Sequence, residues 1–243
     1  MARPFAVFDV DGTLARSSLL QLTVRELVNR GVVSVGPGIE VDKLLDDWRQ
    51  RVNDATYGNV MKKAVDIMFS DLPDGLRKRD YDSAVHDIVA VELANTYVYT
   101  SELIKTLRDK DYFLIAISGG ELRAVELFAR SLNFDAWLGA VVYEEQGEKL
   151  TGKIRTLPYK KDEILKTMIS KFDLDLNRSL AVGDTSSDIT MLELVKEPIA
   201  FNPNRELFKV AREKGWIVVV ERKDMVYGMT KDGETYKLTQ TNV

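Results

Sequence analysis

The chain has 243 residues, of which 45% are hydrophobic and 30% charged, proportions typical of a globular protein with one large core or a core and an accessory domain. Its formal net charge of −4 provides no basic excess for holding a nucleic-acid backbone. The chain contains no cysteine and one histidine, His86, which excludes disulfides, a thiolate nucleophile, cysteine-ligated zinc and sites that need several histidines.

Apolar runs in this sequence are short. The longest, around Tyr112–Ile117 and Trp216–Val220, are far too short to span a bilayer. The N-terminal apolar run meets a carboxylate at Asp9, which is unlike a signal peptide. We therefore expect a cytoplasmic protein that binds neither membrane nor nucleic acid, while its oligomeric state stays open.

Apolar and polar residues do not alternate within these runs, a pattern typical of strands that are buried on both faces of a parallel sheet. They cover Phe5–Val10, Tyr112–Ile117, Ser179–Val182, Ile199–Phe201 and Trp216–Val220. Helical patterns separate them at Glu121–Leu132, Lys161–Phe172, Ser187–Val195 and Arg205–Lys214. The segments Trp137–Glu144 and Lys149–Arg155 are predicted to form a hairpin that turns at Gly147. This order predicts an α/β fold with a doubly wound parallel sheet.

One long stretch, from Arg16 to Tyr99, shows only helical periodicity. Breaker residues interrupt it at Gly36-Pro37-Gly38 and at Pro73-Asp74-Gly75. Because the stretch is too long for a crossover between two strands, we interpret residues 16–99 as an inserted all-helical domain. Residues 1–15 and 100–243 would then form a discontinuous core.

The strongest chemical signal, Asp9-Val10-Asp11-Gly12-Thr13, follows the first predicted strand. Ligands bind at the carboxyl edge of an open α/β sheet, which is where these carboxylates are expected. A side chain and a backbone carbonyl from this pair suit Mg²⁺, which prefers oxygen ligands. The competing interpretation is a simple turn at the Asp-Gly step.

Three later segments lie after predicted strands or at helix starts. Ser118-Gly119-Gly120 has the hydroxyl and amides of a phosphate cradle, although this triplet is also a common turn. Lys160 and Lys161 open a helix, where one of them could face an anion or both could lie at the surface. Asp184 and Asp188 are four residues apart and could face one site or cap a helix.

Taken in order, these segments resemble the four motifs of the haloacid dehalogenase-like superfamily of phosphatases. The matching residues are Asp9-Val10-Asp11-Gly12-Thr13, Ser118-Gly119-Gly120, Lys161, and Gly183-Asp184 with Asp188. The resemblance covers nearly the whole chain, and the helical insertion resembles the cap of the phosphoserine phosphatase-like branch. Lys161 is preferred to Lys160 because its spacing to Leu165 matches the family's K-x-x-x-L pattern.

The resemblance implies a Mg²⁺-dependent phosphomonoesterase that hydrolyses a small phosphorylated metabolite. Asp9 would attack phosphorus to form an aspartyl-phosphate, and Asp11 would protonate the leaving oxygen. Asp9, the backbone carbonyl of Asp11 and Asp184 would hold the metal. The cap would close over the site and contact the rest of the substrate.

The resemblance also implies roles for the surrounding residues. Lys161 would supply a point charge, while Ser118 and the Gly119 amide would bind phosphoryl oxygens. Asp188 would orient Lys161 or a metal-bound water. Ser187, where relatives tend to have Asn, could join the hydrogen bonds around the metal.

A second departure from the family pattern bears on the substrate. Phosphoserine phosphatases carry a Glu nine residues after the nucleophile, where it meets the substrate amine, and this chain has Ser18 there. We therefore expect that O-phosphoserine is not the best substrate. The alternatives are a phosphoserine phosphatase or phosphotransferase proper, and a catalytically silent phosphate-binding regulatory module.

Overall fold

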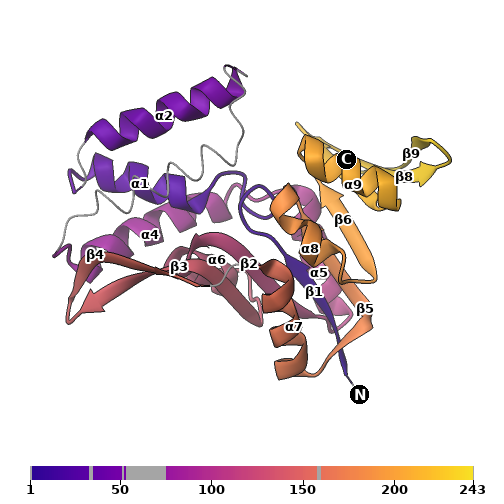
Figure 1. The fold of residues 1–243 in the computed structure, drawn as a ribbon, viewed down its shortest axis with the longest axis horizontal. Helices are drawn as coiled ribbons and strands as arrows, with labels where there is room; N and C mark the ends of the chain where they lie inside the picture. The colour runs from indigo at the N-terminus through magenta and orange to yellow at the C-terminus, as the bar shows by residue number, and fades with distance from the viewer. Residues whose placement is uncertain (1, 33–34, 51, 53–74, 158–159, 243) are drawn as a thin grey trace.

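The computed structural model describes residues 2–32, 35–50, 52, 75–157 and 160–242. Within these ranges a nine-stranded sheet runs in the order β4-β3-β2-β1-β5-β6-β7-β8-β9 (Figure 1). In that order the strands are Lys149–Thr156, Ala136–Gln146, Phe113–Glu121, Arg3–Phe8, Leu174–Gly183, Glu197–Phe201, Ile217–Arg222, Met225–Asp232 and Thr235–Asn242. The strands from β3 to β7 pair in parallel, whereas β4, β8 and β9 pair antiparallel at the two edges. The predicted α/β fold with a doubly wound sheet is thus confirmed.

Both faces of the sheet are buried, as the continuous apolar runs predict. In β1, Ala6 and Phe8 belong to one hydrophobic cluster, and Phe5 and Val7 belong to the other. The first face is covered by α5 (Val98–Asp109) and α6 (Leu122–Ser131). The second face is covered by α7 (Lys161–Phe172), α8 (Ile189–Leu192) and α9 (Arg205–Lys214). Helices on both faces leave the carboxyl ends of the parallel strands as the place for a site.

Besides α5, three described helices lie between β1 and β2 in the sequence: α1 (Leu19–Asn29), α2 (Val35–Arg49) and α4 (Lys78–Leu93). They lie together beside the β3–β4 side of the sheet (Figure 1). Apolar residues of α1 and α4 join the hydrophobic cluster of the first sheet face, so these helices share a continuous core with it. The predicted domain boundaries at residues 15/16 and 99/100 stay a prediction. Residues 53–74 of the predicted helical stretch lie outside the described residues.

The two connections between the helical insertion and the sheet meet at one buried carboxylate. Glu221, at the end of β7, accepts hydrogen bonds from Arg16 Nη2 at 2.5 Å and from the Tyr99 backbone N–H at 2.9 Å. The Arg16 guanidinium also lies 4.4 Å from the centre of the Tyr97 ring. These contacts hold the entering and leaving segments of the insertion against the sheet.

Three details differ from the sequence prediction. Gly36-Pro37-Gly38 does not break a helix but lies in the first turns of α2, where proline is tolerated because early helical N–H groups lack intrahelical acceptors. The helix predicted at Ser187–Val195 is shorter, a 3₁₀ turn at Ser186–Asp188 (η1) followed by α8. The hairpin of β8 and β9 was not predicted, because its mixed polar residues lack a long apolar run.

None of the helices in the described ranges is long and apolar enough to cross a bilayer. His86 lies exposed on α4.

Candidate active site

The turn after β1 brings Asp9 and Asp11 to the carboxyl edge of the sheet. Asp9 N–H still bonds the Val182 carbonyl of β5 at 3.0 Å, and the chain then turns with Gly12 at φ +84°. A Cβ at Gly12 would lie 2.1 Å from Asp184 Oδ2, so only glycine permits this close approach. The turn therefore aims both carboxylates into the site and leaves room for a third.

The second motif lies beside the first. Ser118 is buried near the end of β2, and its Oγ accepts a hydrogen bond from Gly120 N–H at 2.9 Å. A Cβ at Gly120 would lie 3.1 Å from Ser118 Oγ and 3.6 Å from Asp11 Oδ2, so these groups share one small space. Gly119 is exposed. The strand continues to Glu121, whose side chain caps α6, so the triplet ends a strand rather than starting a helix.

The two candidate lysines are clearly distinguished. Lys161, the first residue of α7, is 2% exposed, and its Nζ contacts Asp9 Oδ1 and Asp188 Oδ1. The Lys160 side chain is 71% exposed and pairs with Glu163 at the surface. Lys161 is therefore the lysine that the structure brings into the site.

The fourth motif supplies two more carboxylates after β5. Asp188 Oδ2 accepts hydrogen bonds from the backbone N–H groups of Asp184 at 3.1 Å and Thr185 at 2.9 Å. Its other oxygen contacts Lys161, so both oxygens of this fully buried side chain are engaged. A Cβ at Gly183 would lie 2.5 Å from Asp188 Cβ, which explains the glycine there. Ser187 is exposed and bonds the Thr185 hydroxyl at 2.9 Å, away from direct contact with the carboxylates.

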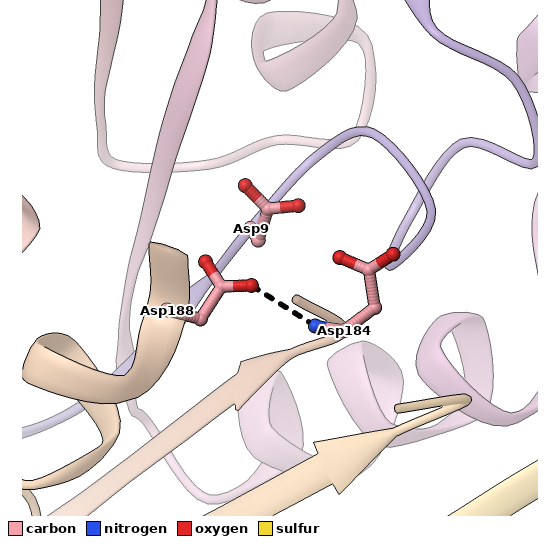
Figure 2. A group of neighbouring side chains, drawn as sticks. All are labelled: Asp9, Asp184 and Asp188. Carbon is pink, nitrogen blue, oxygen red and sulfur yellow. Dashed lines mark hydrogen bonds between the residues drawn. The ribbon is translucent and has the colours of Figure 1, made fainter. Parts of the chain in front are cut away.

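Three of these carboxylates form a cluster that could hold a metal ion. Oxygens of Asp9, Asp184 and Asp188 lie within 4.8 Å of one another. Figure 2 shows the three side chains converging from the end of β1 and from the turn after β5. Asp184 Oδ1 is buried and has no hydrogen-bond partner among the described residues. An oxygen cluster with one unsatisfied buried atom fits a hard cation such as Mg²⁺.

The pKa values of the site carboxyls are raised by burial and by neighbouring negative charges. Burial raises the pKa of Asp9 to about 7, even though Lys161 lowers it. Burial also raises the pKa of Asp11 to about 6, against the effect of the Leu19 N–H, which donates to its Oδ1 at 3.0 Å. Burial and the charges of Asp9 and Asp188 raise the pKa of Asp184 well above its usual value. The carboxylates thus need more positive charge than Lys161 supplies.

One buried acid at this site was not recognised from the sequence. Glu92 of α4 is 4% exposed and accepts a hydrogen bond from the Ser17 N–H at 3.1 Å. Its charge is among those that raise the pKa of Asp11. Glu92 continues the helical spacing of Val85, Ile88 and Val89. An acid on this otherwise apolar helix face was the sequence signal that could have identified it as a buried acid.

Comparison with known proteins agrees with this geometry. The sequence profile of the family described as haloacid dehalogenase-like hydrolase matches residues 6–193. A phosphoserine phosphatase from Wolinella succinogenes is 25% identical over 223 residues, which are 90% of this chain and 95% of that protein. One from Methanocaldococcus jannaschii is 27% identical over 222 residues, 90% of this chain and 92% of that protein.

A solved structure extends the similarity to the fold. It is described as a phospho-aspartyl intermediate analogue of phosphoserine phosphatase and matches with a TM-score of 0.62. The match covers 92% of this chain and 96% of that chain at 22% identity. At 22% identity, this structural similarity supports the fold and not the function.

Proposed function

This chain belongs to the haloacid dehalogenase-like hydrolase family, and we propose that it is a Mg²⁺-dependent phosphomonoesterase acting through an aspartyl-phosphate on Asp9. The observation that carries the proposal is the buried contact between Asp9 and Lys161 at the carboxyl edge of the sheet. It places a carboxylate nucleophile next to a positive charge that a phosphoryl group requires.

Asp9 and Asp11 divide the chemistry between them. An Asp9 oxygen forms a bond to phosphorus as the bond from phosphorus to the leaving oxygen breaks, and Asp11 gives that oxygen its proton. In the second step Asp11 takes a proton from the attacking water, whose oxygen forms a bond to phosphorus as the bond between phosphorus and Asp9 breaks. The pKa of Asp11, about 6, lies near neutral pH and suits a group that both gives and accepts a proton.

The phosphoryl oxygens are bound by groups on two different elements. The Ser118 hydroxyl and the Gly119 amide, at the end of β2, donate hydrogen bonds to them. Lys161, at the start of α7, adds a point charge. Asp188 positions Lys161, since one of its oxygens contacts the ammonium and the other is held by two backbone amides.

The carboxylates of Asp9 and Asp184 and the backbone carbonyl of Asp11 would hold Mg²⁺. When bound, the ion supplies positive charge that offsets the carboxylates and the phosphoryl group. Asp184 Oδ1, which has no hydrogen-bond partner in the described part of the chain, supports this assignment.

The substrate class is a small phosphorylated metabolite. Relatives named phosphoserine phosphatase make phosphoserine a second candidate, but Ser18 stands where those enzymes are expected to have an acid. The first test is phosphate release from p-nitrophenyl phosphate with and without Mg²⁺. We expect release that depends on Mg²⁺, whereas no release from this or any other phosphomonoester would favour a silent phosphate-binding module.

A further inference from the structure

The triplet proposed to bind phosphate lies in a β-bulge between β2 and β3. Ser118 of β2 pairs with Gly139 of β3. The pairing resumes at Glu121 with Val141, so β2 advances by three residues where β3 advances by two. A Cβ at Gly139 would lie 3.0 Å from the Gly120 carbonyl oxygen, so the bulged segment packs directly on the backbone of β3. Because a bulge redirects the groups of its strand, the residue that ends it helps to fix the groups inside it.

Glu121 ends this bulge and is held from two sides. Its side chain is buried, and it accepts hydrogen bonds from the backbone N–H groups of Arg123 at 2.9 Å and Ala124 at 3.1 Å. Both donors belong to the first turn of α6 and are therefore local. The Tyr81 hydroxyl of α4 donates to Glu121 Oε2 at 3.1 Å from 40 positions away. This hydrogen bond ties the end of the bulge to the helical insertion.

Tyr81 is itself firmly placed. It is fully buried, and its ring packs edge-to-face against Tyr143 of β3 with the ring centres 5.2 Å apart. The Arg123 guanidinium lies 5.8 Å from the centre of the Tyr81 ring and pairs with Asp82, the next residue of α4. Because the ring makes these packing contacts, Tyr81→Phe keeps them and removes the hydrogen bond to Glu121.

We propose that Tyr81 is a positioning residue for phosphate binding that acts through Glu121. The Tyr81 hydroxyl holds the Glu121 carboxylate, and Glu121 fixes the end of the bulge. The bulge carries the Ser118 hydroxyl and the Gly119 amide. The inference rests on the proposed function, because that function assigns these two groups to the phosphoryl oxygens.

The test measures the Kd of inorganic phosphate by isothermal titration calorimetry in the presence of Mg²⁺. Tyr81→Phe is expected to raise this Kd by about 5- to 20-fold, part of the effect of one hydrogen bond to a charged acceptor. Well below the Tm, the Kd reports on folded molecules. A purely structural role of Tyr81 would therefore lower the Tm and leave the Kd unchanged.

A matched control removes the same group at the opposite edge of the sheet. The Tyr236 hydroxyl of β9 donates to the Trp216 carbonyl oxygen at 3.0 Å, a hydrogen bond of similar length. Tyr236→Phe is expected to keep the Kd of phosphate within about twofold of the wild-type value.

A double variant tests whether Tyr81 acts through Glu121. Glu121→Ala is expected to raise the Kd at least as much as Tyr81→Phe does, and adding Tyr81→Phe to it should change the Kd by less than about twofold. If Glu121→Ala does not fold, Glu121→Gln, which keeps the side-chain length but cannot accept hydrogen bonds at both positions, is expected to raise the Kd in its place.

The inference is overturned if Tyr81→Phe leaves the Kd as unchanged as Tyr236→Phe does. It is also overturned if the Glu121 variants bind phosphate like the wild type, or if Tyr81→Phe keeps its full effect in the Glu121→Ala protein. Hydrolysis of p-nitrophenyl phosphate separates this inference from the proposed function. A protein that hydrolyses the ester but shows no change of Kd in the variants refutes the inference alone. A protein that shows the expected Kd values but hydrolyses no phosphomonoester refutes the proposed function alone, and one that neither binds phosphate nor hydrolyses the ester refutes both.

Discussion

Lys161 and Asp9 lie 152 positions apart in the sequence, yet their side chains form an ion pair that is almost completely buried. Lys161 Nζ also contacts Asp188, so one ammonium lies between two carboxylates from different parts of the sheet edge. The pairing joins the first strand, the start of α7 and the turn after β5 into one site. It makes the positive charge at the nucleophile a fixed part of the fold.

Removing this ammonium should affect both stability and activity. Lys161→Met leaves Asp9 and Asp188 buried without their shared counter-charge, which is expected to lower the free energy of unfolding by about 3–5 kcal/mol at pH 7. Loss of one phosphoryl-binding charge should lower kcat by roughly 10²–10³-fold. Urea denaturation and steady-state kinetics measure the two effects.

The neighbouring lysine is the matched control for that variant. Lys160 is exposed and pairs only at the surface with Glu163, so Lys160→Met should change stability by less than about 0.5 kcal/mol. Equal effects from the two variants would contradict the placement of Lys161 in the site.

Metal removal should silence the enzyme reversibly. EDTA is expected to abolish phosphate release and Mg²⁺ to restore it, with Mn²⁺ a possible substitute, because the ligands are all oxygens. Asp184→Ala should raise the Mg²⁺ concentration for half-maximal activity by at least about tenfold, whereas Ser187→Ala, which removes an exposed hydroxyl, should leave it nearly unchanged. Better restoration by Zn²⁺ than by Mg²⁺ would argue against this site.

Gly12 should tolerate no side chain. Gly12→Ala forces a Cβ into contact with the Asp184 carboxylate in addition to the strain of φ +84°. Gly31→Ala is the control: Gly31 has φ +69°, but among the described residues no atom lies within 4 Å of the added Cβ, so this variant carries only the conformational cost of about 1 kcal/mol. The Tm of thermal unfolding and kcat should both be lower for Gly12→Ala than for Gly31→Ala. Equal losses of Tm and kcat in the two variants would show that this turn does not constrain Asp184.

The raised pKa values predict how pH changes the stability of the metal-free protein. Burial raises the pKa of the Asp9 carboxyl to about 7 in the folded protein, from about 3.9 in the unfolded chain. Between these pH values the folded state therefore binds more protons than the unfolded state, and its stability falls as pH rises. Asp9→Asn removes this loss. The variant's stability relative to wild type should therefore increase from pH 5 to pH 7.5, by an amount on the order of a few kcal/mol. Urea denaturation of the metal-free proteins measures it, and a difference that does not change with pH would contradict the burial of a charged Asp9.

Much of the fold follows from features that are local in the sequence. The unbroken apolar run of β1 predicts a strand buried on both faces, and Ala6 and Val7 do lie in different hydrophobic clusters. The Asp9-to-Thr13 segment predicts a turn with carboxylates at the sheet edge, because the glycine follows directly after both acids. Such signals need no knowledge of distant contacts.

Features that depend on distant contacts could not be predicted in this way. Glu221 accepts a hydrogen bond from Arg16, which lies 205 positions earlier in the sequence. No sequence pattern predicts this contact between the end of β7 and the segment after the first motif. Glu92 became recognisable only when the structure placed it beside Ser17, since its helix otherwise follows an ordinary amphipathic pattern. The β8–β9 hairpin was missed because antiparallel pairing lets polar residues occupy its exposed positions.

The covalent intermediate is tested most directly in an Asp11→Asn variant given p-nitrophenyl phosphate and Mg²⁺. The p-nitrophenolate leaving group of this substrate needs no protonation, so Asp9 is still expected to be phosphorylated in the variant. The attack of water on the intermediate requires Asp11 as a base and is expected to be slowed by roughly 10²–10⁴-fold. Acid quenching and peptide mass spectrometry should then find a phosphoryl group on Asp9, and none in the Asp9→Asn, Asp11→Asn double variant. Phosphate on another residue, or turnover by Asp9→Asn at more than a small fraction of the wild-type rate, would contradict the account.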